Sequence, residues 1–258
     1  MPGLMLHAGA NAIDRFTLAT LPVPAALGPR HVVRPFIDDV EAVTDLMRAN
    51  GIRIKDEAFG ITGTAQDPKR FFGVLECTLE GEHLTADEYG LMVGLRGAYD
   101  QSLPRGLAVG SRVFVCDNLA FSGEVAISTK QTTHIGRRIP ELLARAVGRI
   151  PVMAQRQAQR FEAYRNTALK PRWGDAALVE LLRRGVLNSQ TLARAVKEWD
   201  EPSHPEHAEQ GHSVWRLHNA ATEAIKPTEG RANVLPAWDK TTELTKFLDD
   251  VCGISFVH

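Results

Sequence analysis

The sequence predicts an α+β protein with an antiparallel β-sheet, a β-hairpin that leads into a long basic helix, and a helical C-terminal part. Three observations support this fold class. Short runs up to residue 130 alternate apolar and polar residues, which is the period of a β-strand. From residue 136 the apolar residues recur every three or four positions, which is the period of an α-helix. Glycine-rich and polar turns separate the short runs, as in sheets built from hairpins.

The length of 258 residues is enough to bury a substantial core. We divide the chain into an α+β core domain with an N-terminal lead-in, residues 1–172, and a helical C-terminal region packed on it, residues 173–258. No apolar run reaches the roughly 18–20 residues that span a membrane. The three cysteines are widely spaced and odd in number. We therefore expect free thiols, a cytoplasmic location and no membrane partner.

The N-terminal half reads as a lead-in, one helix and several strands. Residues 1–36 are rich in Gly, Pro and short apolar runs, which predicts an irregular or edge-strand lead-in. A helix begins at Asp38 and ends where Asn50–Gly51 stops it. Strand-like runs follow near 70–81 and 88–100. The hairpin places a strand around 112–116 against one around 124–130.

The C-terminal half reads as helices throughout. An apolar stripe at helical spacing runs from Ile139 to Ile150. Pro151 then either kinks this helix or begins a second one that reaches about Leu169. Further helices are predicted at 176–184, 190–199, around 215–225 and near 241–251, with a polar loop at 200–212. The segment 178–199 fits either a plain helical hairpin or a helix-turn-helix that reads DNA.

The net charge of −1 hides two segments of opposite sign. Residues 38–100 hold thirteen acids and six bases, a net of −7, whereas residues 137–172 hold nine bases and two acids, a net of +7. Five arginines of the basic segment fall within roughly 60° of one another on a helix of about 100° per residue. Guanidinium groups match phosphate oxygens bidentately, so we predict contacts to a nucleic-acid backbone. With two flanking residues, the predicted nucleic-acid-binding set is Lys130, Arg137, Arg138, Arg145, Arg149, Arg156 and Arg160.

Two alternatives stay open for this arginine stripe. It is also consistent with a solvated helix face, or with a face paired to the acidic segment of the same or a neighbouring subunit. Binding to single strands without sequence preference also needs aromatic platforms on which bases stack. Phe161, Tyr164 and Trp173 are the candidates, with core packing as the alternative for the first two.

Signals for catalysis and for metal binding are weak. The chain contains no nucleophile elbow, no HExxH, no P-loop and no GxGxxG. Four histidines occur within fifteen residues, but they begin in a proline-containing loop without the tight spacing typical of metal ligands: His204, His207, His212 and His218. We therefore predict no catalytic residues, no metal site and no cofactor.

Three stretches carry a resemblance to a known family. They are "FFGVL", "EYGLMVGLRGAYDQSLPRGLAVGSRVFVCDNLAFSGEV" and the late "VWRLHNAATEAIK". Over most of residues 35–230 the chain resembles the phage- and plasmid-borne family named domain of unknown function nine hundred thirty-two, which implies a mobile-element setting. In outline, a sheet and hairpin that lead into a basic helix are also similar to single-strand annealing proteins related to the eukaryotic Rad group. Those proteins form rings that hold single-stranded DNA by its backbone.

Together these features predict a non-enzymatic protein that binds and anneals single-stranded DNA, or RNA, in phage or plasmid recombination. The segments of opposite charge and the exposed strand edges predict a homo-oligomer, either a ring or a filament. Two other functions stay open. The protein could bind a host protein through its arginine face, or it could be a metal-dependent nuclease or other hydrolase with converging carboxylates.

Overall fold

Six strands form one antiparallel sheet in the part of the chain that we describe from a computed structural model: residues 11–79, 89–113, 118–129, 138–209, 211–225 and 234–255. Each strand pairs with the next one along the chain, so the order in the sheet is the order in the sequence. The strands are β1 (Asn11–Ile13), β2 (Ile52–Gly63), β3 (Pro68–Leu79), β4 (Tyr89–Ala98), β5 (Arg105–Val113) and β6 (Asn118–Thr129). The prediction of an α+β fold with an antiparallel sheet and a helical C-terminal part is confirmed.

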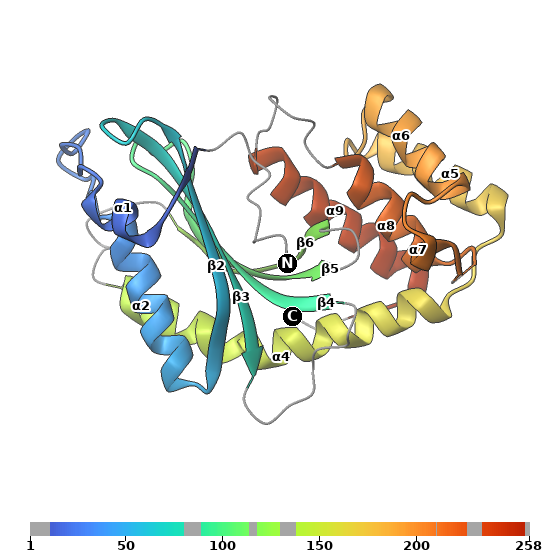
Figure 1. Ribbon diagram of the computed structural model, residues 1–258, viewed down its shortest axis with the longest axis horizontal. Coiled ribbons are helices and arrows are strands. Elements are labelled where there is room, and N and C mark those ends of the chain that lie inside the picture. The colour runs from blue at the N-terminus through green and yellow to red at the C-terminus, as the bar shows by residue number, and fades with distance from the viewer. Residues whose placement is uncertain are drawn as a thin grey trace.

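The helices gather beside the sheet and in the C-terminal half (Figure 1). They are α1 (Arg15–Thr20), α2 (Phe36–Ala49), α4 (Ile139–Asn166), α5 (Pro171–Arg183), α6 (Ser189–Asp200), α7 (Pro205–Glu209), α8 (Val214–Ile225) and α9 (Val234–Cys252). Pro151 lies inside α4, so the two predicted segments form one helix of 28 residues. None of the described helices is both long and apolar enough to cross a membrane.

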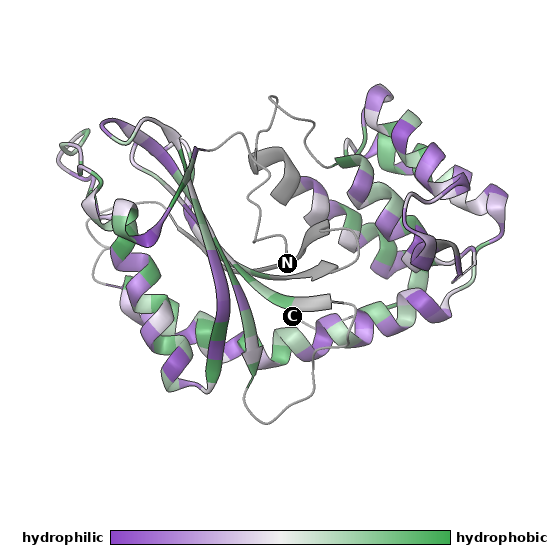
Figure 2. Ribbon diagram, viewed as in Figure 1, coloured by the Kyte–Doolittle hydropathy of each residue, from purple (hydrophilic) through white to green (hydrophobic). Residues whose placement is uncertain are grey.

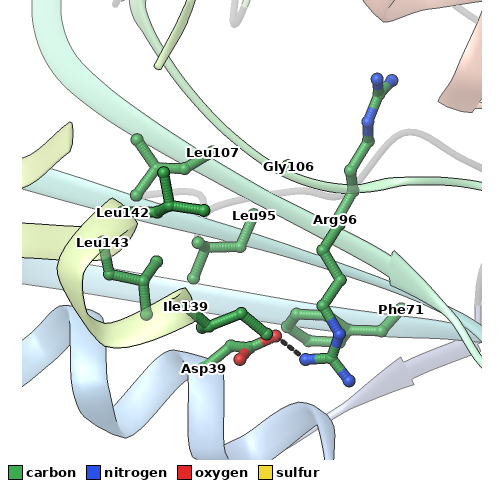
Figure 3. A pocket seen from close by; sticks show the side chains of 10 residues that line it. Asp39, Phe71, Leu95, Arg96, Gly106, Leu107, Ile139, Leu142 and Leu143 are labelled. Carbon is green, nitrogen blue, oxygen red and sulfur yellow. Dashed lines mark hydrogen bonds and ion pairs between the residues drawn. The ribbon is translucent and has the colours of Figure 1, made fainter. Parts of the chain in front are cut away.

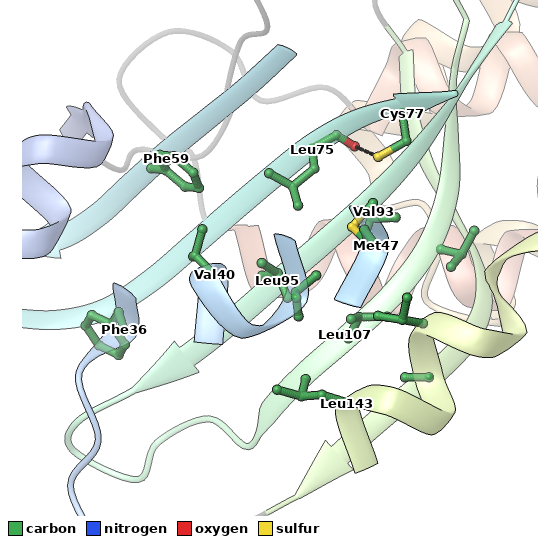
Figure 4. Packing of buried hydrophobic residues seen from close by; sticks show 14 of the residues in the cluster. Phe36, Val40, Met47, Phe59, Leu75, Cys77, Val93, Leu95, Leu107 and Leu143 are labelled. Carbon is green, nitrogen blue, oxygen red and sulfur yellow. Dashed lines mark hydrogen bonds between the residues drawn. The ribbon is translucent and has the colours of Figure 1, made fainter. Parts of the chain in front are cut away.

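One hydrophobic cluster joins the sheet to α2 and to the first half of α4 (Figure 4). Alternate residues of the strands point to this face, as the period of a strand requires. Apolar and polar residues also alternate around both helices (Figure 2), and their apolar sides meet the sheet. The ring of Phe36, at the start of α2, stacks on Tyr99 with 3.8 Å between centroids. Burial of these side chains fixes α2 and α4 side by side on the sheet.

A second hydrophobic cluster lies among the C-terminal helices. It contains the second half of α4 together with residues of α5, α6, α8 and α9. The change from the first cluster to the second falls between Ala154 and Phe161, which is inside α4. Helix α9 also lies against β6. The long helix therefore belongs to both cores and ties the sheet to the helical part (Figure 1).

The structure adds elements that the sequence patterns did not predict. Strand β2 was missed because its register shifts between Ile54 and Asp56, which breaks the alternation of apolar and polar residues. Helix α1 lies within a lead-in that was predicted to be irregular or an edge strand, and β1 of the same segment is an edge strand of the sheet. Strand β5 begins at Arg105, seven residues before the predicted start of the hairpin. Short strands and a single-turn helix carry too few residues for a period to show.

Gly148 offers a test of the middle of α4. It lies in the helix interior, and a Cβ added there would have nothing within 4 Å. Because glycine loses more backbone entropy than alanine on helix formation, Gly148→Ala should raise the free energy of unfolding by about 0.5–1 kcal/mol. Urea denaturation of both chains measures this difference. A loss of stability would show that the outer side of α4 at this turn is closely packed.

Candidate nucleic-acid interface

The first half of α4 presents three of the predicted arginines on its exposed side. Arg138 precedes the first turn of the helix, and Arg145 and Arg149 follow at intervals of seven and four residues. All three side chains are exposed. We call these three residues the arginine edge. Two other predicted residues, Lys130 and Arg137, lie outside the described residues.

The two remaining arginines of the stripe lie deeper. Arg156 is half-buried, and Arg160 is only 4% exposed. The Arg160 Nε atom donates to both carboxylate oxygens of Asp249 on α9, at 2.8 and 3.0 Å, and its Nη1 atom donates to Gln157. The prediction for Arg160 is therefore corrected, because its guanidinium group is enclosed between α4 and α9 and binds a carboxylate of the same chain.

Asp249 is shared between Arg160 and a buried tyrosine. The hydroxyl of Tyr164 donates to Asp249 Oδ1 at 2.7 Å. Burial and the neighbouring Asp249 carboxylate raise the pKa of the Tyr164 hydroxyl well above its usual value, so it stays protonated and keeps donating. Phe161 and Tyr164 are both completely buried and fill the helical core, which excludes them as stacking platforms in this conformation.

Among the described residues, Arg145 pairs with one carboxylate of its own helix, and this ion pair is weak. Its Nη2 atom lies 2.5 Å from Glu141 Oε1, one turn earlier in α4, and both side chains are more than half exposed at 67% and 56%. An exposed pair at this spacing contributes only about 0.3–0.5 kcal/mol. A phosphate could therefore replace Glu141 at little cost.

The acidic segment makes its ion pairs elsewhere in the described structure. Asp39 pairs with Arg34 and Arg105, and Glu57 pairs with Arg15. Within the described residues, the side chains of Arg138 and Arg149 form neither a hydrogen bond nor an ion pair. The described contacts thus leave these two cations of the arginine edge to solvent or to a ligand.

A buried ion pair adjoins the first turns of α4 (Figure 3). Asp39 of α2 binds Arg105 of β5, whose side chain is 5% exposed, and Arg105 also donates to the backbone oxygen of Arg34. Burial, together with the charge of Arg34, lowers the pKa of Arg105 to about 10. The pair borders a cavity of about 30 Å³ that Ile139, Leu142 and Leu143 of α4 close from one side. No local sequence pattern predicts this pair, because its partners are 66 residues apart.

Helix α8 carries an unusual buried polar face. Arg216, His218, Asn219 and Thr222 are all buried. Arg216 donates to the backbone oxygens of Trp199 and Asp200, and Asn219 and Thr222 donate to backbone oxygens of α8 itself. These bonds tie α8 to the end of α6 and satisfy much of its polar side. They explain the mixed composition of "WRLHNAATEAIK" as internal contacts.

Two atoms on that face have no hydrogen-bond partner among the described residues, Asn219 Oδ1 and His218 Nδ1. The ring of His218 stacks on Trp215, with 5.4 Å between the ring centroids. Burial lowers the pKa of His218 to about 3, helped by the positive charges of His207 and Arg160. His218 is therefore a neutral core residue at physiological pH.

The other predicted chemistry can be placed only in part. Among the described residues, no group of three or more His, Cys, Asp and Glu side chains could hold a metal ion. Cys77 and Cys252 are free thiols, and burial raises the pKa of both. Cys116, the third cysteine, lies outside the described residues.

Comparison with known proteins gave no match of any kind: no family model, no curated protein and no solved structure is significantly similar to the chain. The resemblance stated from the sequence stays a prediction. The function is therefore argued from the residues alone.

Proposed function

We propose that this protein binds single-stranded nucleic acid through the arginine edge of α4 and anneals strands in the cytoplasm, as a homo-oligomer encoded by a phage or plasmid. The observation that carries this proposal is the exposure of Arg138, Arg145 and Arg149 along one side of one helix. None of the three pairs with an acid from another described element. The site would hold phosphates without a metal or a cofactor.

The spacing of the edge suits a polyanion. At a rise of about 1.5 Å per residue, Arg145 and Arg149 lie roughly 6 Å apart along the helix axis, and Arg138 lies roughly 10 Å before Arg145. Each guanidinium group can bind a phosphate through two parallel hydrogen bonds. Since α4 is packed on the sheet along its opposite side, the helix is a rigid support and its cations need little reordering on binding.

A second candidate function is recognition of a host protein. Val152 is 52% exposed and follows Arg149 by three residues, so an exposed apolar side chain lies beside the arginine edge. A phosphate backbone gains nothing from valine, whereas a protein interface would bury it. Such a partner would bind regardless of added oligonucleotide.

Titration of the full chain with single- and double-stranded oligonucleotides at several salt concentrations separates these functions. Phosphate contacts release counterions, so log affinity should fall linearly with log salt, by about 0.7 per contact for single strands. Single strands should bind more tightly than duplexes of the same length. Absence of binding even at low salt would contradict the proposal, and divalent-metal-dependent cleavage would identify a nuclease instead.

Self-association is a separate expectation. The opposite charges of residues 38–100 and 137–172 can pair between subunits, and an open sheet offers strand edges. Light scattering at working concentrations should therefore give a mass above 28.4 kDa that decreases as salt is added. A mass that stays at one chain at every salt concentration would contradict this.

A further inference from the structure

Trp173, at the start of α5, is an indole that the fold leaves in water. It is 68% exposed, whereas Trp199 and Trp215 are buried at 0% and 1%. Tryptophan is highly buried on average because it gains much from leaving water. The packing of the described residues gives Trp173 no role.

Gly174, the residue after Trp173, explains why the indole of Trp173 points away from the protein. A Cβ atom at Gly174 would lie 2.1 Å from Cζ2 of Trp199, so the backbone of α5 rests directly on that buried ring. Trp173 is about 100° further around the helix, away from the buried side. Its amide nitrogen donates to the backbone oxygen of Lys170 at 2.8 Å, which fixes the first turn. The chain therefore places glycine at the buried position and tryptophan at the exposed one.

The surroundings of Trp173 are basic. Lys170 and Arg172, three residues and one residue before it, are both exposed, and no acid lies in the first turn of α5. Asp175 is roughly 160° away around the helix, on the other flank of Gly174. A flat apolar ring beside two cations is complementary to a base and its neighbouring phosphates.

We propose that Trp173 stacks on an unpaired base and so gives the protein its preference for single strands over duplex. This inference rests on the proposed nucleic-acid binding, and it assigns the selectivity for single strands over duplex to one residue. In a duplex each base is already stacked and paired, so its faces are closed to an indole. In a single strand the face is open, and stacking on it is tolerant of sequence.

The test compares Trp173→Ala, Trp173→Phe and the wild-type chain on three ligands of equal length: a single strand, its duplex and an abasic sugar-phosphate strand. Trp173→Ala should bind the single strand about 5- to 150-fold more weakly and the other two ligands unchanged. Trp173→Phe should recover most of the loss. Val179→Ala is the matched control, because Val179 is another exposed apolar residue of α5, at 43%, and it should behave as wild type.

Each other outcome overturns the inference. If the wild-type chain binds all three ligands and Trp173→Ala binds them equally well, nucleic-acid binding stands and the role of Trp173 fails. If Trp173→Ala lowers the oligomer mass, the indole is a contact between subunits. If the wild-type chain binds none of the ligands, the proposed function fails and this inference fails with it.

Discussion

Asp249→Ala should destabilise the protein by about 3–5 kcal/mol, because it leaves the charge of Arg160 buried without a partner. The Arg160 side chain is 4% exposed, and Asp249 accepts from its Nε atom through both oxygens. The same substitution removes the nearer acceptor of the Tyr164 hydroxyl and leaves it the backbone oxygen of Thr245 at 3.2 Å. For a chain of this length, the expected loss corresponds to roughly 6–20 °C in melting temperature.

The neighbouring carboxylate provides the matched control. Asp250 is exposed, so Asp250→Ala should change the free energy of unfolding by no more than about 0.5 kcal/mol. Thermal and urea unfolding of the two variants gives the comparison. Equal, small losses would show that Arg160 is not dependent on Asp249, and Arg160 would then return to the set of candidate phosphate contacts.

Acid should destabilise the protein through His218. In the folded chain burial holds its pKa at about 3, whereas in the unfolded chain it is near 6.5. Between these two values the unfolded chain binds a proton that the folded chain does not bind. Stability from this group is therefore complete above pH 6.5 and is lost as pH falls towards 3, by up to about 1.4 kcal/mol per pH unit.

The variant His218→Phe isolates this effect. Phenylalanine fits the aromatic surroundings of Trp215, Phe161 and Tyr164 and carries no proton. From pH 7 to pH 5 the wild-type chain should lose about 2 kcal/mol more than the variant. The absolute stability of the variant does not matter, since only the difference in slope is compared. Parallel curves would mean that His218 is protonated or solvated in the folded chain.

Periodicity was sufficient to predict the class of the fold. The alternation of apolar and polar residues in the strands, and the helical spacing of apolar residues after residue 136, extend over segments long enough to be recognised. These periods do not predict which other helices pack against a given helix. Arg160 lies only about 40° around α4 from Arg138, but it is 22 residues further along the helix, in the half that packs against α9. Whether a flanking arginine is exposed depends on a helix 89 residues later in the chain.

Tertiary packing also decides which of the three aromatic candidates for base stacking are exposed. Phe161, Tyr164 and Trp173 are alike in composition and differ only in what covers them, which is a tertiary property. The sequence clue that could have been used is Gly174, since glycine within a helix points to a close approach by another element. The buried pair of Asp39 and Arg105 gave no local clue at all, because both residues look like ordinary surface charges in sequence.

The double variant Arg145→Ala/Arg149→Ala tests the central claim most directly. Loss of about two phosphate contacts should flatten the dependence of log affinity on log salt by roughly 1.4 for single strands. The loss should be similar for unrelated sequences, because phosphate contacts do not read bases. Arg48→Ala/Arg183→Ala is the matched control: it removes two charges from exposed arginines on α2 and α5, which are 76% and 74% exposed.

Both double variants must keep the melting temperature and the oligomer mass of the wild-type chain, since arginine stems also pack against their neighbours. If they do, we expect a flatter salt dependence and weaker binding for Arg145→Ala/Arg149→Ala alone. A folded Arg145→Ala/Arg149→Ala chain that binds single strands with wild-type affinity and wild-type salt dependence would contradict it.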